Sequence, residues 1–141
     1  GTGQSAGALA LRFPRQVKVM PAAGGGTWQG ARLRFAPLPH SGSTNREVEN
    51  SGLLVDFCGR KVFHAGDADL GTANFDGFRA VDVALVPFWY LLDPQGDRVL
   101  RDILQATEVW AIHGDPQDRS WVRRVRERYP NVRIPAYFER R

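Results

Sequence analysis

The sequence predicts a mixed β-sheet with helices on one face, an α+β or α/β layer arrangement. Hairpin signals crowd the first half of the chain, and strand and helix patterns alternate in the second half. Residues 81–87 form a nearly continuous apolar run, which is typical of a strand buried on both faces. Hairpin strands followed by alternating strands and helices build a single layered sheet.

The first half of the chain carries the hairpins. Residues 31–38 alternate between apolar and charged side chains, with Leu33 and Phe35 on one side, which predicts a half-buried strand. Cys58-Gly59-Arg60 lies between two apolar stretches and is a hairpin signal. We expect a short strand at residues 17–20, a turn at 21–26, a strand at 31–38 and a loop at 40–50. Two hairpin strands are expected at 52–57 and 61–65.

The second half alternates strands and helices, which is why the predicted sheet is mixed. A stripe of Val99, Leu100, Ile103 and Leu104 predicts one amphipathic helix, and Pro130 ends a second one. We expect a loop at residues 66–72, one or two helical turns at 73–79, a strand at 81–87 and an aromatic-rich loop at 88–94. A helix is expected at 96–106, a strand at 108–112, a second helix at 117–129 and a last short strand at 132–134.

Length and composition restrict the class of protein. The 141 residues suit one domain or part of one, and 43% hydrophobic with 24% charged residues is an ordinary globular mixture. No apolar run is long enough to span a membrane. The single Cys58 excludes a disulfide-stapled secreted scaffold and makes the cytoplasm the expected location. A net charge of +4 suits an anionic substrate or weak nucleic-acid contact and does not decide between them, and of the two we do not expect nucleic acid as the partner.

Three residues with metal-ligand chemistry each follow a predicted strand. They are His40, Asp67 and His113, and each lies where an apolar run gives way to Gly, Ser or Asp. A carboxylate and two imidazoles can meet at one edge of a sheet, where they suit zinc or a related borderline metal. Each residue alone is better explained by a turn, in which its side chain caps backbone groups. Their coincidence in one short chain favours a shared site.

Four nearby residues carry weaker signals. His64 and Asp69 flank Asp67 and are candidates to support the metal ligands or to orient a water. A local hydrogen bond is the favoured explanation of His64, and a turn-capping role explains Asp69 equally well. Trp89 and Tyr90 follow a predicted strand on the same edge. They are candidates to line a substrate pocket, with packing over the sheet as the alternative.

An ordered set of motifs resembles the second half of the metallo-β-lactamase fold. The chain is most similar to the metal-dependent hydrolases related to ascorbate-6-phosphate lactonase, over roughly residues 15–135. The matching motifs are His40-Ser41-Gly42, Asn50-Ser51-Gly52-Leu53-Leu54-Val55, Phe63-His64-Ala65-Gly66-Asp67-Ala68-Asp69, Asp82-Val83-Ala84-Leu85-Val86-Pro87 and Ala111-Ile112-His113. The resemblance implies a zinc-dependent hydrolase, with this chain forming the C-terminal half of an αββα sandwich.

The resemblance assigns roles to the three strand-end residues. His40 matches the third histidine of the first metal site, Asp67 the aspartate that bridges two metals, and His113 the last histidine of the second site. In this family a metal-bridging hydroxide attacks a carbonyl or phosphoryl centre, because two metals lower the pKa of that water. The implied cofactor is a pair of zinc ions, with manganese or iron as alternatives. The implied substrate is a small, anionic ester, lactone or phosphoester.

One departure from the family is large. Its His-x-His-x-Asp-His signature, which supplies three or four ligands, is missing, since the only histidines are His40, His64 and His113. We therefore expect residues 1–141 to form one partial domain without the N-terminal, ligand-bearing half. A start at Gly1 without methionine favours a start inside a larger gene product or a processed chain. We expect weak metal binding and little turnover unless that half, or a second copy in a homo-oligomer, supplies the other ligands.

A second interpretation is a non-catalytic binding module that keeps the fold. Its arginine-rich C-terminal helix would contact nucleic acid or a protein partner. Against this, Trp121 and Tyr129 of that helix fall on its inner stripe, and the three metal-ligand residues would serve no purpose. Salt separates the two hypotheses, because phosphate-driven binding weakens steeply as the salt concentration rises.

Overall fold

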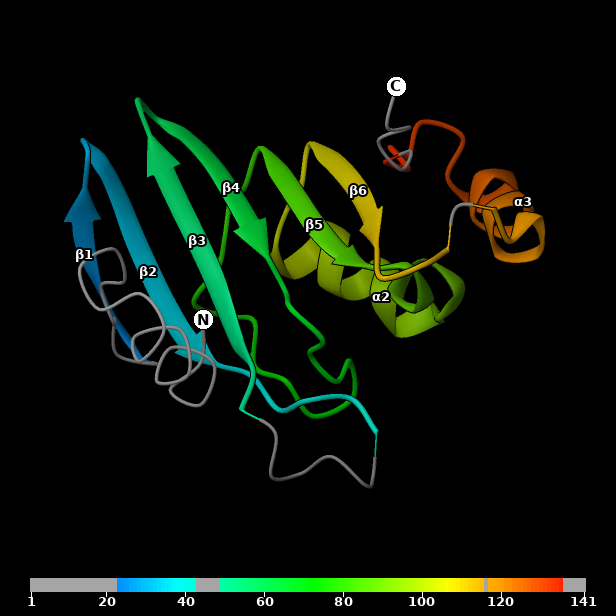
Figure 1. The fold of residues 1–141 in the computed structure, drawn as a ribbon, viewed down its shortest axis with the longest axis horizontal. Coiled ribbons are helices and arrows are strands. Elements are labelled where there is room, and N and C mark those ends of the chain that lie inside the picture. The colour runs from blue at the N-terminus through cyan, green and yellow to red at the C-terminus, as the bar shows by residue number, and fades with distance from the viewer. Residues whose placement is uncertain (1–22, 43–48, 116, 136–141) are drawn as a thin grey trace, which may run out of the picture.

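Six strands form one sheet in the computed structural model, which describes residues 23–42, 49–115 and 117–135. They lie across the sheet in chain order, as β1 (Gly24–Trp28), β2 (Ala31–Pro37), β3 (Ser51–Phe57), β4 (Arg60–His64), β5 (Val83–Pro87) and β6 (Glu108–Ile112) (Figure 1). The pairs from β1 to β4 are antiparallel, while β4, β5 and β6 are parallel to one another. The predicted mixed sheet is confirmed.

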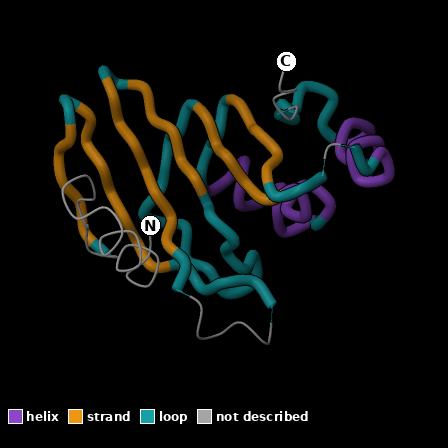
Figure 2. Tube along the Cα trace, viewed as in Figure 1, coloured by secondary structure: helices purple, strands orange, loops and turns teal. Residues whose placement is uncertain are grey.

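Helical segments follow β5 and β6. They are η1 (Phe88–Leu92), α2 (Pro94–Arg98), η2 (Val99–Ile103) and α3 (Arg119–Arg128). α2 and the π-helical η2 form one continuous helix, and the Asp93 carboxylate caps its start by accepting a hydrogen bond from the Gln95 amide at 2.8 Å. The helices gather at the β5–β6 end of the sheet (Figure 2). Within the described ranges, no helix is long and apolar enough to cross a membrane.

The core lies between this helical layer and one face of the sheet. Its centre is Phe63 of β4, which is fully buried and packs against Phe78 at a ring-centre distance of 4.6 Å and against Phe75 at 6.3 Å. Gly52 of β3 adjoins this cluster, where a Cβ atom would lie 2.7 Å from Leu38 and 3.1 Å from Phe63. Only glycine fits at position 52, because protein interiors are packed as densely as organic crystals.

The opposite face of the sheet, called here the open face, is also apolar. The strand register places Phe35, Leu53, Leu85 and Trp110 in one row on it, together with His64. All five residues keep some solvent exposure. A sheet with apolar side chains on both faces suits packing between two layers.

β2 shows how the two faces differ. Its predicted alternation is confirmed, and Leu33 and Phe35 point to the open face. Arg34 is on the core side, where its guanidinium lies 5.7 Å from the ring centre of Phe78 and donates a hydrogen bond to the Gly77 carbonyl. The aliphatic stem and planar head of this arginine therefore cover the rim of the core.

Several predicted elements are confirmed in detail. β6 has the predicted bounds, and the helix predicted at residues 96–106 corresponds to α2 and η2. The turn between β3 and β4 contains Cys58 and Gly59, whose φ angles of 51° and 80° are both positive. A two-residue turn with two positive φ angles matches the twist of the strands that it joins, so the hairpin signal was correct.

Three predictions of local structure are wrong. Residues 24–26, expected in a turn, belong to β1 because they pair with β2. Residues 73–79 form turns instead of a helix, which lets both Phe75 and Phe78 reach the core. The aromatic-rich loop after β5 is the short helix η1. The strand predicted at residues 17–20 lies outside the described residues.

We expect Phe63→Ala to lower the free energy of unfolding by about 3–5 kcal/mol, because it leaves a cavity at the centre of the core. Phe57→Ala makes the same chemical change on the neighbouring strand, where the ring is 53% exposed. That variant should lose about 0.5 kcal/mol or less. Urea titrations of both variants and the wild type measure the difference, and equal losses would contradict this description of the core.

Candidate functional site

The three predicted site residues follow the carboxyl ends of strands that point in the same direction. His40 comes after β2, Asp67 after β4, and His113 directly after β6. β3 is antiparallel to both β2 and β4, and β4 is parallel to β5 and β6, so these ends share one edge of the sheet. The strand-end argument from the sequence therefore places them correctly.

Two loops at this edge are hydrogen-bonded to each other. The Ser41 amide donates to the Asp67 carbonyl at 2.7 Å, and the Asp69 amide donates to the Pro39 carbonyl at 2.7 Å. The resulting antiparallel bridge pairs His40 with Ala68. Backbone pairing therefore brings the His40 loop against the Asp67 loop, although β3 separates their parent strands.

Each oxygen of the Asp67 carboxylate faces a different histidine. Oδ2 lies 3.5 Å from Nε2 of His40, and Oδ1 lies 3.2 Å from Nδ1 of His113. The His40 side chain is 17% exposed, and the other two are each 36% exposed, so solvent reaches the group. The structure brings the three residues together, and their role as metal ligands stays a prediction.

The hydrogen bonding of His40 determines which of its nitrogens faces Asp67 without a proton. Nδ1 lies 2.6 Å from the Ser41 carbonyl oxygen, which can only accept, so Nδ1 carries a proton. In the neutral ring, Nε2 then holds a lone pair, and it faces a carboxylate oxygen that also only accepts. A cation between these two atoms would satisfy both of them.

The turn that carries His113 is fixed by α3. His113 has a φ angle of 64°, in the left-handed region, which costs free energy and is frequent at functional sites. A Cβ atom on Gly114 would lie 2.4 Å from the Trp121 ring. The Trp121 indole also donates a hydrogen bond to the Asp115 carbonyl at 2.7 Å. Trp121 is buried, as its place on the inner stripe of the helix predicted, and it packs against the turn that follows His113.

His64 lies beside the site, but its ring is hydrogen-bonded to the backbone. Its Nδ1 accepts a hydrogen bond from the Gly66 amide at 2.9 Å, so in the neutral ring Nε2 carries the proton. Partial burial lowers the pKa of His64 from its ordinary value of 6.5, the charge of His113 lowers it further, and Asp67 opposes the shift. The local hydrogen bond that the sequence analysis named as one explanation is present.

The remaining predicted residues differ in their surroundings. Asp69 caps a turn, because its Oδ1 accepts from the amides of Gly71 at 2.8 Å and Thr72 at 3.0 Å. Trp89 lies beside the site, with its ring centre 6.0 Å from that of His113. Tyr90 is fully buried, so it does not line an accessible pocket in this structure.

Tyr90 instead contacts the Asp67 loop from the side of the core. Its hydroxyl donates a hydrogen bond to the Ala68 carbonyl at 2.7 Å. Burial raises the pKa of Tyr90 above its ordinary value, and the charges of Asp69 and Asp67 raise it further. At neutral pH the hydroxyl therefore keeps its proton and donates to the Ala68 carbonyl.

Asn50 is a site residue that the sequence analysis missed. Its side-chain oxygen accepts a hydrogen bond from the Asp67 amide at 3.1 Å. The only signal in the sequence was its place in the motif before β3, which gave no reason to link it with Asp67. That link depends on tertiary structure.

The donor set is incomplete for a single metal ion. Within the described ranges, no group of three or more His, Cys, Asp or Glu side chains is arranged so that it could hold one ion. This agrees with the geometry of Asp67, because its two oxygens face His40 and His113 separately. Each position offers one imidazole and one carboxylate oxygen, whereas zinc sites use three or four protein ligands.

No protein-family model matches the chain, and no curated protein is significantly similar to it. Solved structures do match. A candidate Zn-dependent hydrolase of the metallo-β-lactamase superfamily from Thermotoga maritima is 22% identical, with a TM-score of 0.55 over 72% of this chain and 51% of its own. A metallo hydrolase from Ignicoccus hospitalis is 19% identical, with a TM-score of 0.59 over 96% of this chain and 63% of its own.

An isothiocyanate hydrolase from Delia radicum gut bacteria is 13% identical, with a TM-score of 0.60 over 96% of this chain and 62% of its own. The chain has the metallo-β-lactamase fold. It spans between 51% and 63% of the length of these solved structures. The recognition made from the ordered motifs is thereby confirmed at the level of the superfamily fold.

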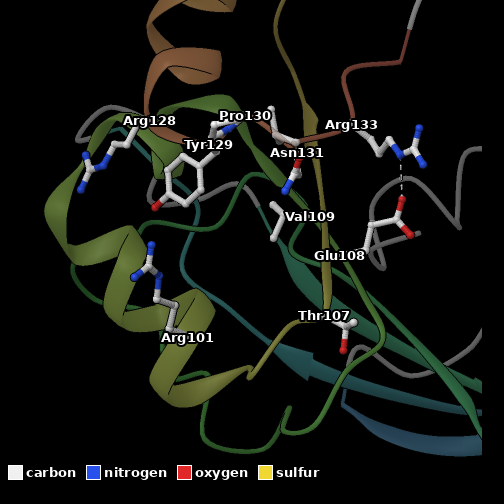
Figure 3. A pocket seen from close by; sticks show the side chains of 10 residues that line it. Arg101, Thr107, Glu108, Val109, Arg128, Tyr129, Pro130, Asn131 and Arg133 are labelled. Atoms are coloured by element: carbon white, nitrogen blue, oxygen red, sulfur yellow. Dashed lines mark hydrogen bonds and ion pairs between the residues drawn. The ribbon is translucent and has the colours of Figure 1, made fainter.

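A groove of about 800 Å³ lies at the other end of β6 (Figure 3). Its lining includes Arg101 of η2, Arg128 of α3, and Arg133, which pairs with Glu108 at 3.1 Å. Glu108 is the first residue of β6, whereas His113 follows the last one. The groove is therefore separate from the candidate site at Asp67.

We expect Tyr90→Phe to lower the free energy of unfolding by about 1–3 kcal/mol, because the buried Ala68 carbonyl loses its donor. Tyr129→Phe is the matched control, since the Tyr129 hydroxyl is buried and has no hydrogen-bond partner within the described structure. The control should be neutral or slightly stabilising. Chemical denaturation of both variants measures this, and a larger loss for Tyr129→Phe would show that the Tyr90 contact has been misassigned.

We expect the pKa of His64 to lie below 6.5 in the folded, metal-free chain. The unfolded state then takes up this proton first as the pH falls, so the stability that His64 contributes is present above pH 6.5 and declines below it. An NMR titration of the imidazole resonances measures the pKa, and His64→Gln assigns them. Titration of His64 at or above 6.5 would be inconsistent with this environment.

Proposed function

We propose that this chain is the C-terminal part of a metal-dependent hydrolase, with His40, Asp67 and His113 as metal ligands. The observation that supports this best is the Asp67 carboxylate, whose two oxygens each face a different imidazole. A carboxylate in this position suits a bridge between two cations. The solved structures with the same fold include metal-dependent hydrolases, which favours the same class of reaction here.

The chemistry of the side chains fits such a pair of metal ions. A neutral His40 presents an unprotonated Nε2 toward Asp67, while its Nδ1 proton goes to the Ser41 carbonyl. Metal-binding histidines commonly donate their other ring N–H to a carbonyl in this way. Nitrogen and carboxylate ligands favour zinc, and we keep manganese and iron as alternatives.

The other ligands must come from outside the three histidines of this chain. His64 is tied to the Gly66 amide through Nδ1, which leaves one histidine for each metal position. We propose that an N-terminal half of the fold, or a second copy of the chain, completes both positions. This agrees with the share of the solved structures that the chain spans, which is 51% of one and 63% of another.

Bound at this site, a divalent metal supplies a Lewis acid and lowers the pKa of a coordinated water. The residues of this chain would orient the ligands and the substrate. Asp67 would offer one carboxylate oxygen to each cation, and Trp89, whose ring lies beside that of His113, would contact the substrate. We propose a small ester, lactone or phosphoester as substrate, and the net charge of +4 favours an anionic one.

We expect Asp67→Ala to weaken zinc binding by roughly tenfold or more, because both metal positions lose an oxygen ligand. Asp76→Ala is a matched control, since Asp76 is an exposed carboxylate that pairs with Arg79 at 3.4 Å. Equilibrium dialysis against zinc, followed by elemental analysis for zinc, iron and manganese, measures the bound metal.

The control should retain as much zinc as the wild type. Equal zinc retention in the Asp67→Ala variant would contradict the assignment of Asp67 as a ligand. Binding of zinc by neither the wild type nor the variants would mean that these residues do not form a metal site without further polypeptide, and the hydrolase proposal would then fail for this chain alone.

A further inference from the structure

Asn50 lies where three segments of the candidate site meet. It directly precedes β3, and its side chain reaches the end of the β2 segment and the loop after β4. The backbone adds a further contact, because the Leu38 amide donates a hydrogen bond to the Asn50 carbonyl at 3.1 Å. These segments carry His40 and Asp67, so Asn50 is placed to control their relative position.

The carboxamide of Asn50 uses both its donor and its acceptor. Nδ2 donates to the carbonyls of Leu38 and Ala65, each at 3.3 Å, and Oδ1 accepts from the Asp67 amide at 3.1 Å. A planar amide offers two donors beside one acceptor, whereas a carboxylate offers no donor and a hydroxyl offers only one. Asparagine therefore matches this set of backbone groups in a way that aspartate and serine do not.

Gly66 is the structural counterpart of Asn50. Its φ angle is 61°, and a Cβ atom at this position would lie 2.1 Å from Oδ1 of Asn50. Any side chain here would displace the carboxamide or the loop. The closeness of Gly66 lets the Asn50 oxygen reach the amide of the next residue, Asp67.

We propose that Asn50 is a positioning residue that holds the backbone of Asp67 so that its two carboxylate oxygens face His40 and His113. The Leu38 contact extends the same support to the segment that leads into His40. Asn50 does not face the metal positions itself and acts through Asp67. Its consequence for metal binding rests on the proposed function, whereas the positioning of the loop does not.

Two substitutions of Asn50 separate positioning from charge. Asn50→Ala removes all three side-chain hydrogen bonds, while Asn50→Asp has nearly the same shape, keeps the acceptor for Asp67 and loses both donors. Asn74→Ala is the matched control, because Asn74 also accepts a backbone hydrogen bond, from Asp76 at 2.9 Å, in another loop. If Asn50→Ala fails to fold, Asn50→Asp alone still tests the positioning role.

The first readout is amide hydrogen exchange at Asp67 in the metal-free chain. We expect exchange to be fastest in Asn50→Ala, intermediate in Asn50→Asp and unchanged in Asn74→Ala, because the amide loses its acceptor or its support. The second readout is zinc affinity by titration calorimetry. We expect both Asn50 variants to bind zinc roughly tenfold to a hundredfold more weakly than the wild type, as is typical when a supporting partner of a ligand is lost.

Each outcome decides a separate point. Unchanged exchange at Asp67 in Asn50→Ala would overturn the positioning role, whatever happens to zinc. Faster exchange with unchanged zinc affinity would overturn its consequence for metal binding. Tighter zinc binding by Asn50→Asp would show that added charge outweighs position and would also overturn that consequence. If the wild type binds no zinc, the proposed function fails for this chain alone, and the exchange data by themselves support or overturn the positioning role.

Discussion

Two backbone hydrogen bonds, from Ser41 to Asp67 and from Asp69 to Pro39, hold the candidate site together. β2 and β4 are separated by β3, and strands two positions apart in a sheet lie about 10 Å from each other. Side chains that extended directly from the two strand ends would remain apart. The pairing of the loops closes this distance, and the imidazole of His40 consequently meets the carboxylate of Asp67 at 3.5 Å.

The loop pairing in turn depends on the core beneath it. Ala65 and Ala68 are fully buried on either side of Asp67, and the Tyr90 hydroxyl holds the Ala68 carbonyl. Asn50 holds the same loop from the side of β3. The loop is therefore supported by side chains from two other parts of the chain, while the Asp67 carboxylate remains open to solvent. Sites built in this way keep their geometry because their supports are buried and hydrogen-bonded.

The sequence predicted those features that depend on local pattern. Strand-end placement predicted that His40, Asp67 and His113 lie at one edge of the sheet, because an apolar run that ends in a turn marks an edge of the sheet wherever it occurs. The two-residue turn that contains Cys58 and Gly59 was also predictable from the sequence. The role of Asn50 and the hydrogen bond of Tyr90 to Ala68 were not predictable, since each depends on a backbone carbonyl or amide that is distant in the sequence.

Both faces of the sheet are apolar, and this links the incomplete ligand set to the packing of the chain. Trp28 and Phe57 are 57% and 53% exposed, and the register places both on the open face with Leu33 and Val55. A second layer packed there would remove this apolar surface from water, and its loops would meet the same edge of the sheet as Asp67. Under the proposed function, one added element would then complete the core and the metal positions together. Metal binding and association would be coupled, because ligands that are brought together only by packing make the binding free energy part of the folding free energy.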